Sequence, residues 1–247
     1  RYLDWRRRWR YSRRLRGNDT YIFNKGDGND TIEEYAGNDT LKFGEGISKE
    51  DIIVKKNGYG GAYSNDIVIS FKNNPTDSIT LKDVIRMNEA NKNKMIENFI
   101  FSNGDKLSFD DIRQLSLIGS NEKDDIKGYS DLNNIFQGMD GDDHLWGQRT
   151  DETFIGGKGN DYLGGDGGDD TYIFSPGDGN DIIFDYEGTN ILQFTEGITK
   201  DDLLIGLEES RFIIRFKNSN DSIWFPHTSI KKIQFFNGDE LSYEEMK

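Results

Sequence analysis

Apolar and polar residues alternate over short runs along most of this chain, and turn-forming dipeptides separate the runs. In residues 67–71 and 212–216, for example, every second side chain is apolar, and Asn-Gly, Asp-Gly or Gly-Asp pairs bound such runs. A period of two is typical of a half-buried β-strand, and these dipeptides favour hairpins and turns. No apolar run approaches the length needed to cross a membrane as a helix. The pattern predicts an all-β fold of short strands.

Between residues 119 and 183 a nine-residue period is added to this alternation. The best unit, residues 156–164, fits the pattern G-G-x-G-x-D-x-U-x, where U is a large apolar residue. The units begin at Gly119, Gly128, Gly138, Gly147, Gly156, Gly165 and Pro176. The eighth positions are all apolar: Ile126, Ile135, Leu145, Phe154, Leu163, Tyr172 and Ile183. The sixth positions all carry a side-chain oxygen: Asp124, Asn133, Asp143, Glu152, Asp161, Asp170 and Asp181.

A unit of one turn and one short strand cannot bury its apolar residue alone, so the units must stack. Two units per turn predict a right-handed parallel β-roll in which each unit lies over the next but one. Asp143 then lies over Asp161, and Asp161 over Asp181. Adjacent carboxylates cannot all stay ionised without a counter-cation. Oxygen ligands in flexible turns favour Ca²⁺ over Mg²⁺, and with no Cys and only two His in the chain, zinc is disfavoured.

An internal duplication surrounds the array. Residues 17–23 match 168–174 at an offset of 151, and residues 41–47 match 192–198 at the same offset. Copy one has two extra segments, residues 58–64 and 86–94, and residues 83–97 are compatible with a short helix. We predict an N-terminal segment at 1–16, a β-rich module at 17–117, the β-roll at 118–183, and a second β-rich module at 184–247 that caps the roll.

The array resembles the RTX (repeats-in-toxin, haemolysin-type) calcium-binding repeats, above all at residues 138–146, 156–164 and 165–173. The flanking modules share F-x-x-G-I-x-x-x-D-(I/L) and N-G-D-x-L-S patterns, and they resemble the haemolysin-type calcium-binding-related extensions. The resemblance implies Ca²⁺ ligation by the sixth-position carboxylates and leaderless export by the type I secretion apparatus.

The candidate ligands combine these carboxylates with residues of the turns. They are Asp143, Asp161, Asp170, Asp181, Glu152, Asp124, Gly138, Asp140, Gly156, Lys158, Gly159, Gly165, Gly167, Asp178, Asp19 and Asp30. The first units lack the later glycines, so we expect the strongest sites at Asp143, Asp161, Asp170 and Asp181. Asp19 and Asp30 belong to copy one, where the partner turns have lost their pattern.

The N-terminal segment 1–16 differs from the rest of the chain, because it contains eight arginines and two tryptophans. The 151-residue offset places Arg10 at the position of Asp161, and Arg or Trp at six glycines of the two corresponding turns. We interpret the segment as a degenerate pair of nonapeptides that binds no calcium. Contact with an anionic membrane stays open as an alternative, and nucleic acid is not an expected partner because the body of the chain is acidic.

Composition fits an exported calcium-binding chain. The formal net charge is −14, from 45 acidic and 31 basic residues, and there is no cysteine to form a disulfide. A folded chain of such charge repels itself unless cations bind. The N-terminus has no apolar signal-peptide core and no Met, so we expect a piece of a longer protein.

We therefore predict a secreted, extracellular and non-catalytic calcium-binding module that folds after export. The first alternative is an adhesion module, on the cell surface or against a host surface or glycan, that uses the aromatics Tyr59, Tyr63, Trp224 and Phe225. The second is an accessory domain of a secreted lipase, protease or toxin. No G-x-S-x-G, H-E-x-x-H or phosphate-loop motif occurs in the sequence.

Overall fold

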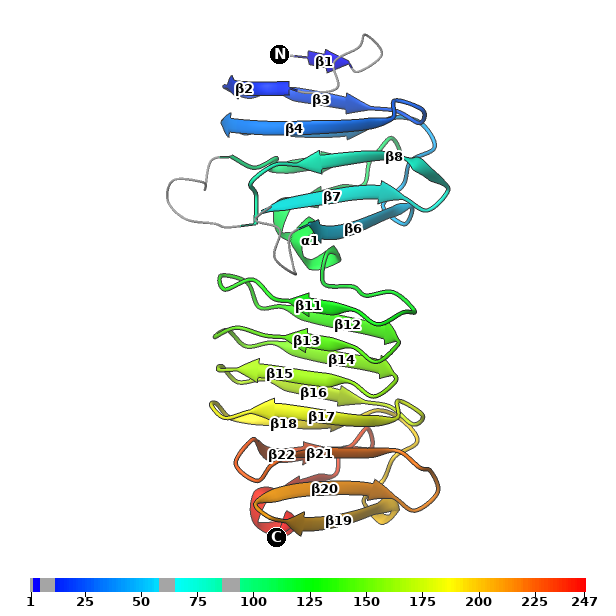
Figure 1. The fold of residues 1–247 in the computed structure, drawn as a ribbon, viewed down its shortest axis with the longest axis vertical. Coiled ribbons are helices and arrows are strands. Elements are labelled where there is room, and N and C mark those ends of the chain that lie inside the picture. Colours follow the sequence, from blue (N-terminus) through cyan, green and yellow to red (C-terminus); the bar gives the residue numbers. More distant parts are fainter. Residues whose placement is uncertain (1, 5–11, 58–64, 86–93) are drawn as a thin grey trace. The chain divides into compact units, whose positions relative to one another are not determined.

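The computed structural model describes residues 2–4, 12–57, 65–85 and 94–247, and Figure 1 shows their arrangement as strands. The chain divides into two compact units, Arg1–Ser116 and Leu117–Lys247. Each unit consists of two sheets of short strands, which confirms the predicted β fold. Within the described residues, no helix is both long and apolar enough to span a membrane.

The second unit is a parallel β-roll extended by two hairpins. Its seven-stranded sheet contains, in spatial order, β11 (Asp125–Lys127), β13 (His144–Trp146), β15 (Tyr162–Asp166), β17 (Asn180–Asp185), β21 (Ser222–Pro226), β20 (Arg211–Phe216) and β19 (Leu203–Glu208). Its six-stranded sheet contains β12 (Ile135–Asp140), β14 (Thr153–Lys158), β16 (Thr171–Phe174), β18 (Asn190–Phe194), β22 (Ile230–Gln234) and β23 (Glu240–Ser242). Consecutive strands from β11 to β18 alternate between the sheets, and neighbours within a sheet are parallel, which confirms the predicted stacking.

The apolar residues of the nonapeptides form two columns between these sheets. Phe136, Phe154 and Tyr172 stack face to face, with ring centroids 4.8 Å and 5.0 Å apart. In the other sheet Leu145 pairs with Leu163, and Leu163 with Ile183, and all three are buried. The eighth position is therefore the core position of every unit in these columns except the one that begins at Gly128.

One unit breaks the predicted register. Ile135 was predicted to be buried but is 47% exposed, whereas the next residue, Phe136, is fully buried. The same shift exposes Asn133 and buries Asn134. The prediction was wrong by one residue because the unit that starts at Gly128 has ten residues before Gly138, and the extra one is an asparagine.

The first unit repeats the same plan. One sheet contains β1 (Tyr2–Asp4), β3 (Thr20–Phe23), β5 (Thr40–Phe43), β9 (Asn98–Ile100) and β10 (Lys106–Ser108). The other contains β2 (Ser12–Arg16), β4 (Asn29–Ala36), β8 (Asn74–Leu81), β7 (Asp66–Phe71) and β6 (Ile52–Asn57). Tyr2 pairs with Thr20 as Thr153 pairs with Thr171, so the offset of 151 residues is preserved in the strand register. The backbone of β1 and β2 thus continues the roll of this unit.

Each copy ends in a short helix that begins at the Ser of its N-G-D-x-L-S pattern. Ser108 caps α1 (Phe109–Leu115), where its Oγ accepts a hydrogen bond from the backbone N–H of Asp111 at 3.2 Å. Ser242 stands at the same place before α2 (Tyr243–Met246), and Glu245 accepts a hydrogen bond from its backbone N–H at 2.7 Å. A 3-10 turn, η2 (Lys200–Asp202), precedes β19.

Some sequence predictions concern residues that the structure does not describe. These are the segment 58–64 with Tyr59 and Tyr63, the segment 86–93, and Arg10. The flanks of the helix predicted over 83–97 are described at 83–85 and 94–97, and they are not helical.

Candidate metal centre

Four acidic residues form one column along the second unit. The carboxylates of Asp143, Asp161 and Asp181 each accept a hydrogen bond through Oδ1 from the backbone N–H of the acidic residue one turn earlier. The N–H to Oδ1 distances are 2.7 Å for Asp124 to Asp143, 2.8 Å for Asp143 to Asp161, and 3.0 Å for Asp161 to Asp181. Asp143, Asp161 and Asp181 are buried, while Asp124 is half-buried. The column follows the order that the nine-residue period predicts.

The first glycine of each well-formed unit leaves room for the carboxylate of that unit. A Cβ atom on Gly156 would lie 2.3 Å from Oδ2 of Asp161, and one on Gly138 would lie 2.4 Å from Oδ2 of Asp143. The same holds for Gly165, where a Cβ would lie 2.2 Å from Oδ2 of Asp170. Any larger residue would displace the carboxylate, which gives a packing reason for glycine at this position.

A second column forms on the other edge of the roll, from Asn134, Glu152, Asp170 and Asn190. The Asn134 side chain donates to Oε1 of Glu152 at 3.0 Å, and the backbone N–H of Glu152 donates to Oδ1 of Asp170 at 2.8 Å. The backbone N–H of Asp170 donates in turn to Oδ1 of Asn190 at 2.8 Å. This column is less acidic than the first, because an asparagine stands at each end.

Sequence reasoning missed Asn190, although a signal for it exists. Asn190 follows Asp181 by nine residues and precedes the buried Leu192 by two, so residues 185–193 form a further nonapeptide. Its first position is Asp185 instead of glycine. The same unit recurs in the first copy at residues 34–42, with Glu34 at the first position and Asp39 at the sixth.

Burial shifts the protonation of these carboxylates. Burial, reinforced by neighbouring carboxylates, raises the pKa of Asp161 to about 7 and that of Asp181 to about 8. Burial and the charges of Asp185 and Glu152 raise the pKa of Asp170 to about 9. Oδ2 of Asp161 and Oδ2 of Asp170 are buried and accept no hydrogen bond from the described residues. Buried acceptors of this kind are uncommon in folded proteins and need a compensating partner.

The oxygen donors of the columns fit calcium. Carboxylate oxygens and turn carbonyls are the ligands that calcium takes in flexible geometry. At the strand spacing of about 4.8 Å, two ionised carboxylates repel each other by roughly 3 kcal/mol at an effective dielectric constant of 20. A divalent cation beside them would remove both the repulsion and the lack of a partner at Oδ2.

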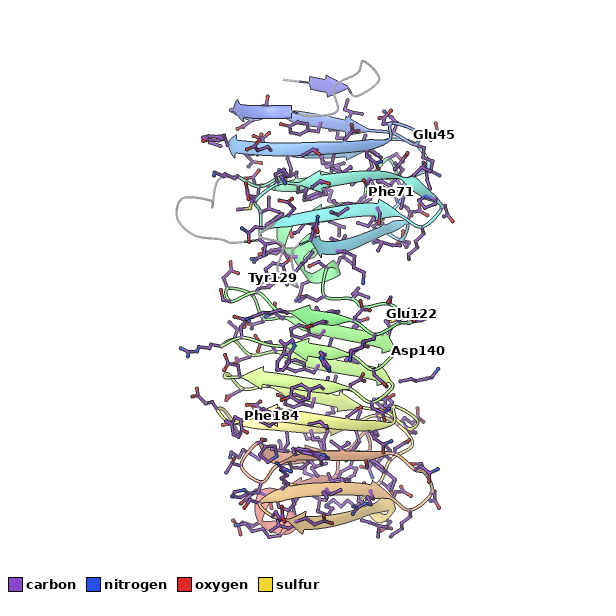
Figure 2. All side chains as sticks on the ribbon, viewed as in Figure 1. Glu45, Phe71, Glu122, Tyr129, Asp140 and Phe184 are labelled. Atoms are coloured by element: carbon purple, nitrogen blue, oxygen red, sulfur yellow. The ribbon has the colours of Figure 1, made fainter. Side chains whose placement is uncertain are left out.

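The remaining predicted turn residues differ in the oxygen atoms that they could offer to a cation. The side chain of Asp140 is exposed (Figure 2), and its carboxylate lies 3.7 Å from the ammonium group of Lys158. Lys158 could serve as a ligand only through its carbonyl, because an ammonium group has no acceptor. The carbonyl of Lys158 accepts a hydrogen bond from the N–H of Gly141 at 2.7 Å, and that of Asp178 accepts one from the N–H of Gly159 at 2.7 Å. A carbonyl has a second lone pair, which remains available to a cation.

Two further positions complete the predicted set of the second unit. Asp178 is buried, and its carboxylate accepts a hydrogen bond from the N–H of Ser175 at 2.7 Å. Burial, reinforced by the charge of Asp221, raises the pKa of Asp178 to about 6. Gly167 is buried in the turn before β16, and its N–H donates to the carbonyl of Gln148 at 3.0 Å.

In the first unit, Asp19 and Asp30 are both buried but lie in different columns. Asp30 pairs with Ile79 across β4 and β8. The backbone N–H of Asp19 donates to Oδ1 of Asp39 at 2.7 Å, and the N–H of Asp39 donates to Oε2 of Glu97 at 2.5 Å. The second acidic column of this unit is therefore Asp19, Asp39 and Glu97, of which only Asp19 was predicted.

Comparison with known proteins identifies the repeats. A model of the RTX calcium-binding nonapeptide repeat matches in four copies, within residues 26–48, 129–163 and 149–178. Among solved structures, the crystal structure of the extracellular lipase LipA from Serratia marcescens is similar, with 16% sequence identity and a TM-score of 0.38. That similarity covers 91% of this chain and 40% of the lipase chain. No curated protein matches this sequence.

Proposed function

We propose that this chain, which carries RTX calcium-binding nonapeptide repeats, is a calcium-dependent folding module of a larger secreted protein. The observation that carries the proposal is the pair of buried acidic columns in the second unit, in which Oδ2 of Asp161 and Oδ2 of Asp170 accept no hydrogen bond from the described residues. A column of this kind is costly to bury without cations and stable with them.

Different positions of each turn would supply different calcium ligands. When bound, calcium supplies the positive charge that allows stacked carboxylates to stay ionised in the roll. The sixth-position carboxylates of Asp143, Asp161 and Asp181 provide the anionic oxygens, and carbonyls at the first and third positions provide neutral ones. The glycines at the first positions keep the carboxylates close to the backbone. Asp161 lies between two acidic neighbours, so it can serve two successive turns.

The expected affinity explains how folding follows export. Extracellular calcium modules bind with dissociation constants of roughly 10⁻⁴ to 10⁻³ M. The cytosol holds far less free calcium than this, so the acidic columns would stay unfolded until the chain reaches the outside. Binding free energy would then become folding free energy, as in other metal-dependent domains. Leaderless transport through a type I apparatus fits this order of events.

Circular dichroism tests the proposal directly. The chain should lose most of its β signal in EGTA at pH 8 and regain it in 10 mM CaCl₂. The same concentration of MgCl₂ should not restore it, because Mg²⁺ requires octahedral geometry and keeps its waters. Unchanged β-content after exhaustive chelation would refute the proposal.

A second function, ligand binding on the roll, has one observation in its favour. Aromatic side chains follow one another from β13 through β15 to β17, with ring centroids 4.9 Å apart from Trp146 to Tyr162 and 5.7 Å from Tyr162 to Phe184. Tyr186, directly after β17, continues the series at 4.9 Å from Phe184. Tyr186 is 60% exposed. An aromatic strip of this kind offers faces on which sugar rings can stack.

Trp224 and Phe225, which the sequence suggested for such a surface, differ in burial. Trp224 is half-buried, and the guanidinium of Arg211 lies 4.6 Å from its ring centroid. Phe225 is fully buried against Phe212, so its predicted exposure was wrong. The reason is the strand alternation, since adjacent residues of β21 face opposite sides. Quenching of Trp146 fluorescence by soluble glycans in calcium would support the binding function, and an unchanged spectrum would remove it.

A further inference from the structure

The last three strands of the seven-stranded sheet carry a pocket on their outer face. The strands β21, β20 and β19 lie side by side at the C-terminal end of the second unit (Figure 1). The pocket has a volume of about 540 Å³ and is lined by Glu208, Glu209, Arg211, Ile213 and Trp224. Sites for small molecules have volumes of this order, and they combine apolar walls with a few convergent polar groups.

The strand register explains the hollow. Gly206, Ile213 and Trp224 stand opposite one another on the three strands. Their neighbours Phe212 and Phe225 are buried in the core, so the strand alternation turns Ile213 and Trp224 to the outer face. A Cβ on Gly206 would meet a single atom within 4 Å, the carbonyl oxygen of Ile213 at 3.9 Å. The hollow thus has an aliphatic floor at Ile213, an indole wall at Trp224 and open space above Gly206.

The equivalent row of the first unit carries different side chains. Lys55, Val68 and Thr80 stand opposite one another on β6, β7 and β8, and pairing with the strands of the roll aligns this row with that of the second unit. A long lysine stands where the second unit has Gly206, and a small hydroxyl residue stands where it has Trp224. The same backbone plan accepts both sets, so the fold alone does not account for the glycine and the indole.

Charged groups border one end of the hollow. The guanidinium of Arg211 lies 4.6 Å from the ring centroid of Trp224 and holds the indole in place. The guanidinium of Arg215 lies 3.8 Å from the carboxylate of Glu208. With Glu209, two carboxylates and two guanidinium groups surround the hollow. Their charges balance, which favours a neutral ligand over an anion or a cation.

Glu209 stands in an unfavourable backbone conformation. Glu209 and Ser210 form the two-residue loop between β19 and β20, with φ angles of 46° and 73°. Such loops prefer Asn or Gly, because other side chains are strained at positive φ. The carbonyl of Ser210 accepts a hydrogen bond from the backbone N–H of His227 at 2.9 Å, which anchors the loop. Residues held in strained conformations cluster at binding sites, and the side chain of Glu209 lines the pocket.

We propose that this pocket binds a neutral saccharide, with one sugar ring on Ile213 and Trp224 and its hydroxyls bonded to Glu208, Glu209 and Arg211. The C–H face of a sugar ring is apolar and packs on an indole. Its hydroxyls both donate and accept, so they can donate to the carboxylates and accept from the guanidinium. A purely apolar ligand would leave these charged groups without partners.

The site lies on other strands than the aromatic strip that runs from β13 to β17. It deepens the ligand-binding function named above, because it supplies a defined pocket and a ligand class. It rests on the proposed calcium module only in requiring the folded second unit.

Titration calorimetry of the full chain in 10 mM CaCl₂ tests the site with neutral and charged probes. Maltohexaose and cellohexaose are neutral, sialyllactose is anionic, and choline is a cation that aromatic rings can bind. At least one neutral probe should bind, and neither charged probe should. The inference is wrong if no neutral probe binds, or if sialyllactose or choline binds in its place.

Variants assign the binding to this pocket. Trp224→Thr introduces the residue that the first unit has there and should weaken binding by roughly tenfold or more. Gly206→Lys should also weaken it, because the new side chain fills the hollow, and it gives a second measurement if Trp224→Thr fails to fold. Glu209→Asn suits the loop better, so it should raise the free energy of unfolding and still weaken saccharide binding. A purely structural role of Glu209 would not separate these two effects.

Glu196→Asn is the matched control, since it removes the same charge from an exposed turn of the second unit and should bind like the wild type. The inference is overturned if Gly206→Lys and Glu209→Asn bind the neutral probe as tightly as Glu196→Asn. Circular dichroism separates this result from the proposed function. A β signal that does not depend on calcium would refute the calcium-dependent module, whereas a fully folded chain that binds no neutral probe refutes only the saccharide site.

Discussion

The substitution Asp161→Asn should stabilise the calcium-free protein and weaken its response to calcium. Asparagine has nearly the shape of aspartate, and its Oδ1 can accept the same hydrogen bond from the backbone N–H of Asp143. Burial raises the pKa of Asp161 from 3.8 to about 7 in the folded chain. A folded pKa above the unfolded one means that the contribution to stability is complete below pH 3.8 and is lost as the pH rises through 7.

The size of the effect follows from this shift. A difference of about three pKa units corresponds to roughly 4 kcal/mol, which the calcium-free chain loses at pH 8 and the amide variant does not. In calcium the wild type should instead be more stable than the variant. Each site filled at one hundred times its dissociation constant adds about 2.7 kcal/mol to the free energy of unfolding. Because Asp161 lies between two turns, its loss should reduce the calcium-induced gain by about 5 kcal/mol.

Urea unfolding measures both effects through the fluorescence of Trp146 and Trp224, which lie in the second unit. All measurements are made at pH 8. Because the calcium-free wild type is largely unfolded, wild type and variant are compared in EGTA by their folded fraction without urea, and in 10 mM CaCl₂ by full urea curves. Asp142→Asn is the matched control, since Asp142 is the exposed neighbour of Asp143. A variant that is less stable than wild type in EGTA, or that keeps the full calcium gain, would refute the electrostatic account of the column.

Other positions allow independent tests. Gly156→Ala should weaken calcium binding at least tenfold by titration calorimetry, because the new Cβ would lie 2.3 Å from Oδ2 of Asp161; Gly206→Ala, whose nearest atom would be at 3.9 Å, should not. Lowering the pH from 8 to 6 should weaken calcium binding in the same calorimetry but raise the folded fraction in EGTA, measured by circular dichroism. The folded pKa values of Asp181 and Asp170, about 8 and about 9, lie above the unfolded value, so their contribution is lost as the pH rises through them. Phe154→Ala should lower the free energy of unfolding in calcium by about 3–5 kcal/mol in urea titrations, because it leaves a cavity within a column of stacked rings.

The nine-residue period alone was sufficient to predict the roll and most of its first acidic column. Leu145, Phe154 and Leu163 are buried where the eighth position predicts. Stacking of alternate units follows from the same repeat, because each unit needs a neighbour to bury its apolar residue. The duplication at an offset of 151 residues likewise appears in the strand register. These features are local or periodic, so they can be deduced from the order of residues.

Other features depend on how separate turns meet in space. The inserted residue after Gly128 moved the buried position from Ile135 to Phe136, because the core accepts whichever side chain restores the stacking with Phe154. Glu34 stands at a first position where the pattern has glycine, so only the paired strands showed that Glu34 and Asp39 meet Asp19. The first unit has an acid, Asp39, at the position where the second unit has an amide, Asn190. Only the amide can donate hydrogen bonds to the surrounding carbonyls, and those carbonyls come from distant parts of the chain. The sequence by itself determined the repeat and its chemistry, because both lie in the spacing of residues. The tertiary structure decided which carboxylates share one buried space, because burial and proximity exist only after folding.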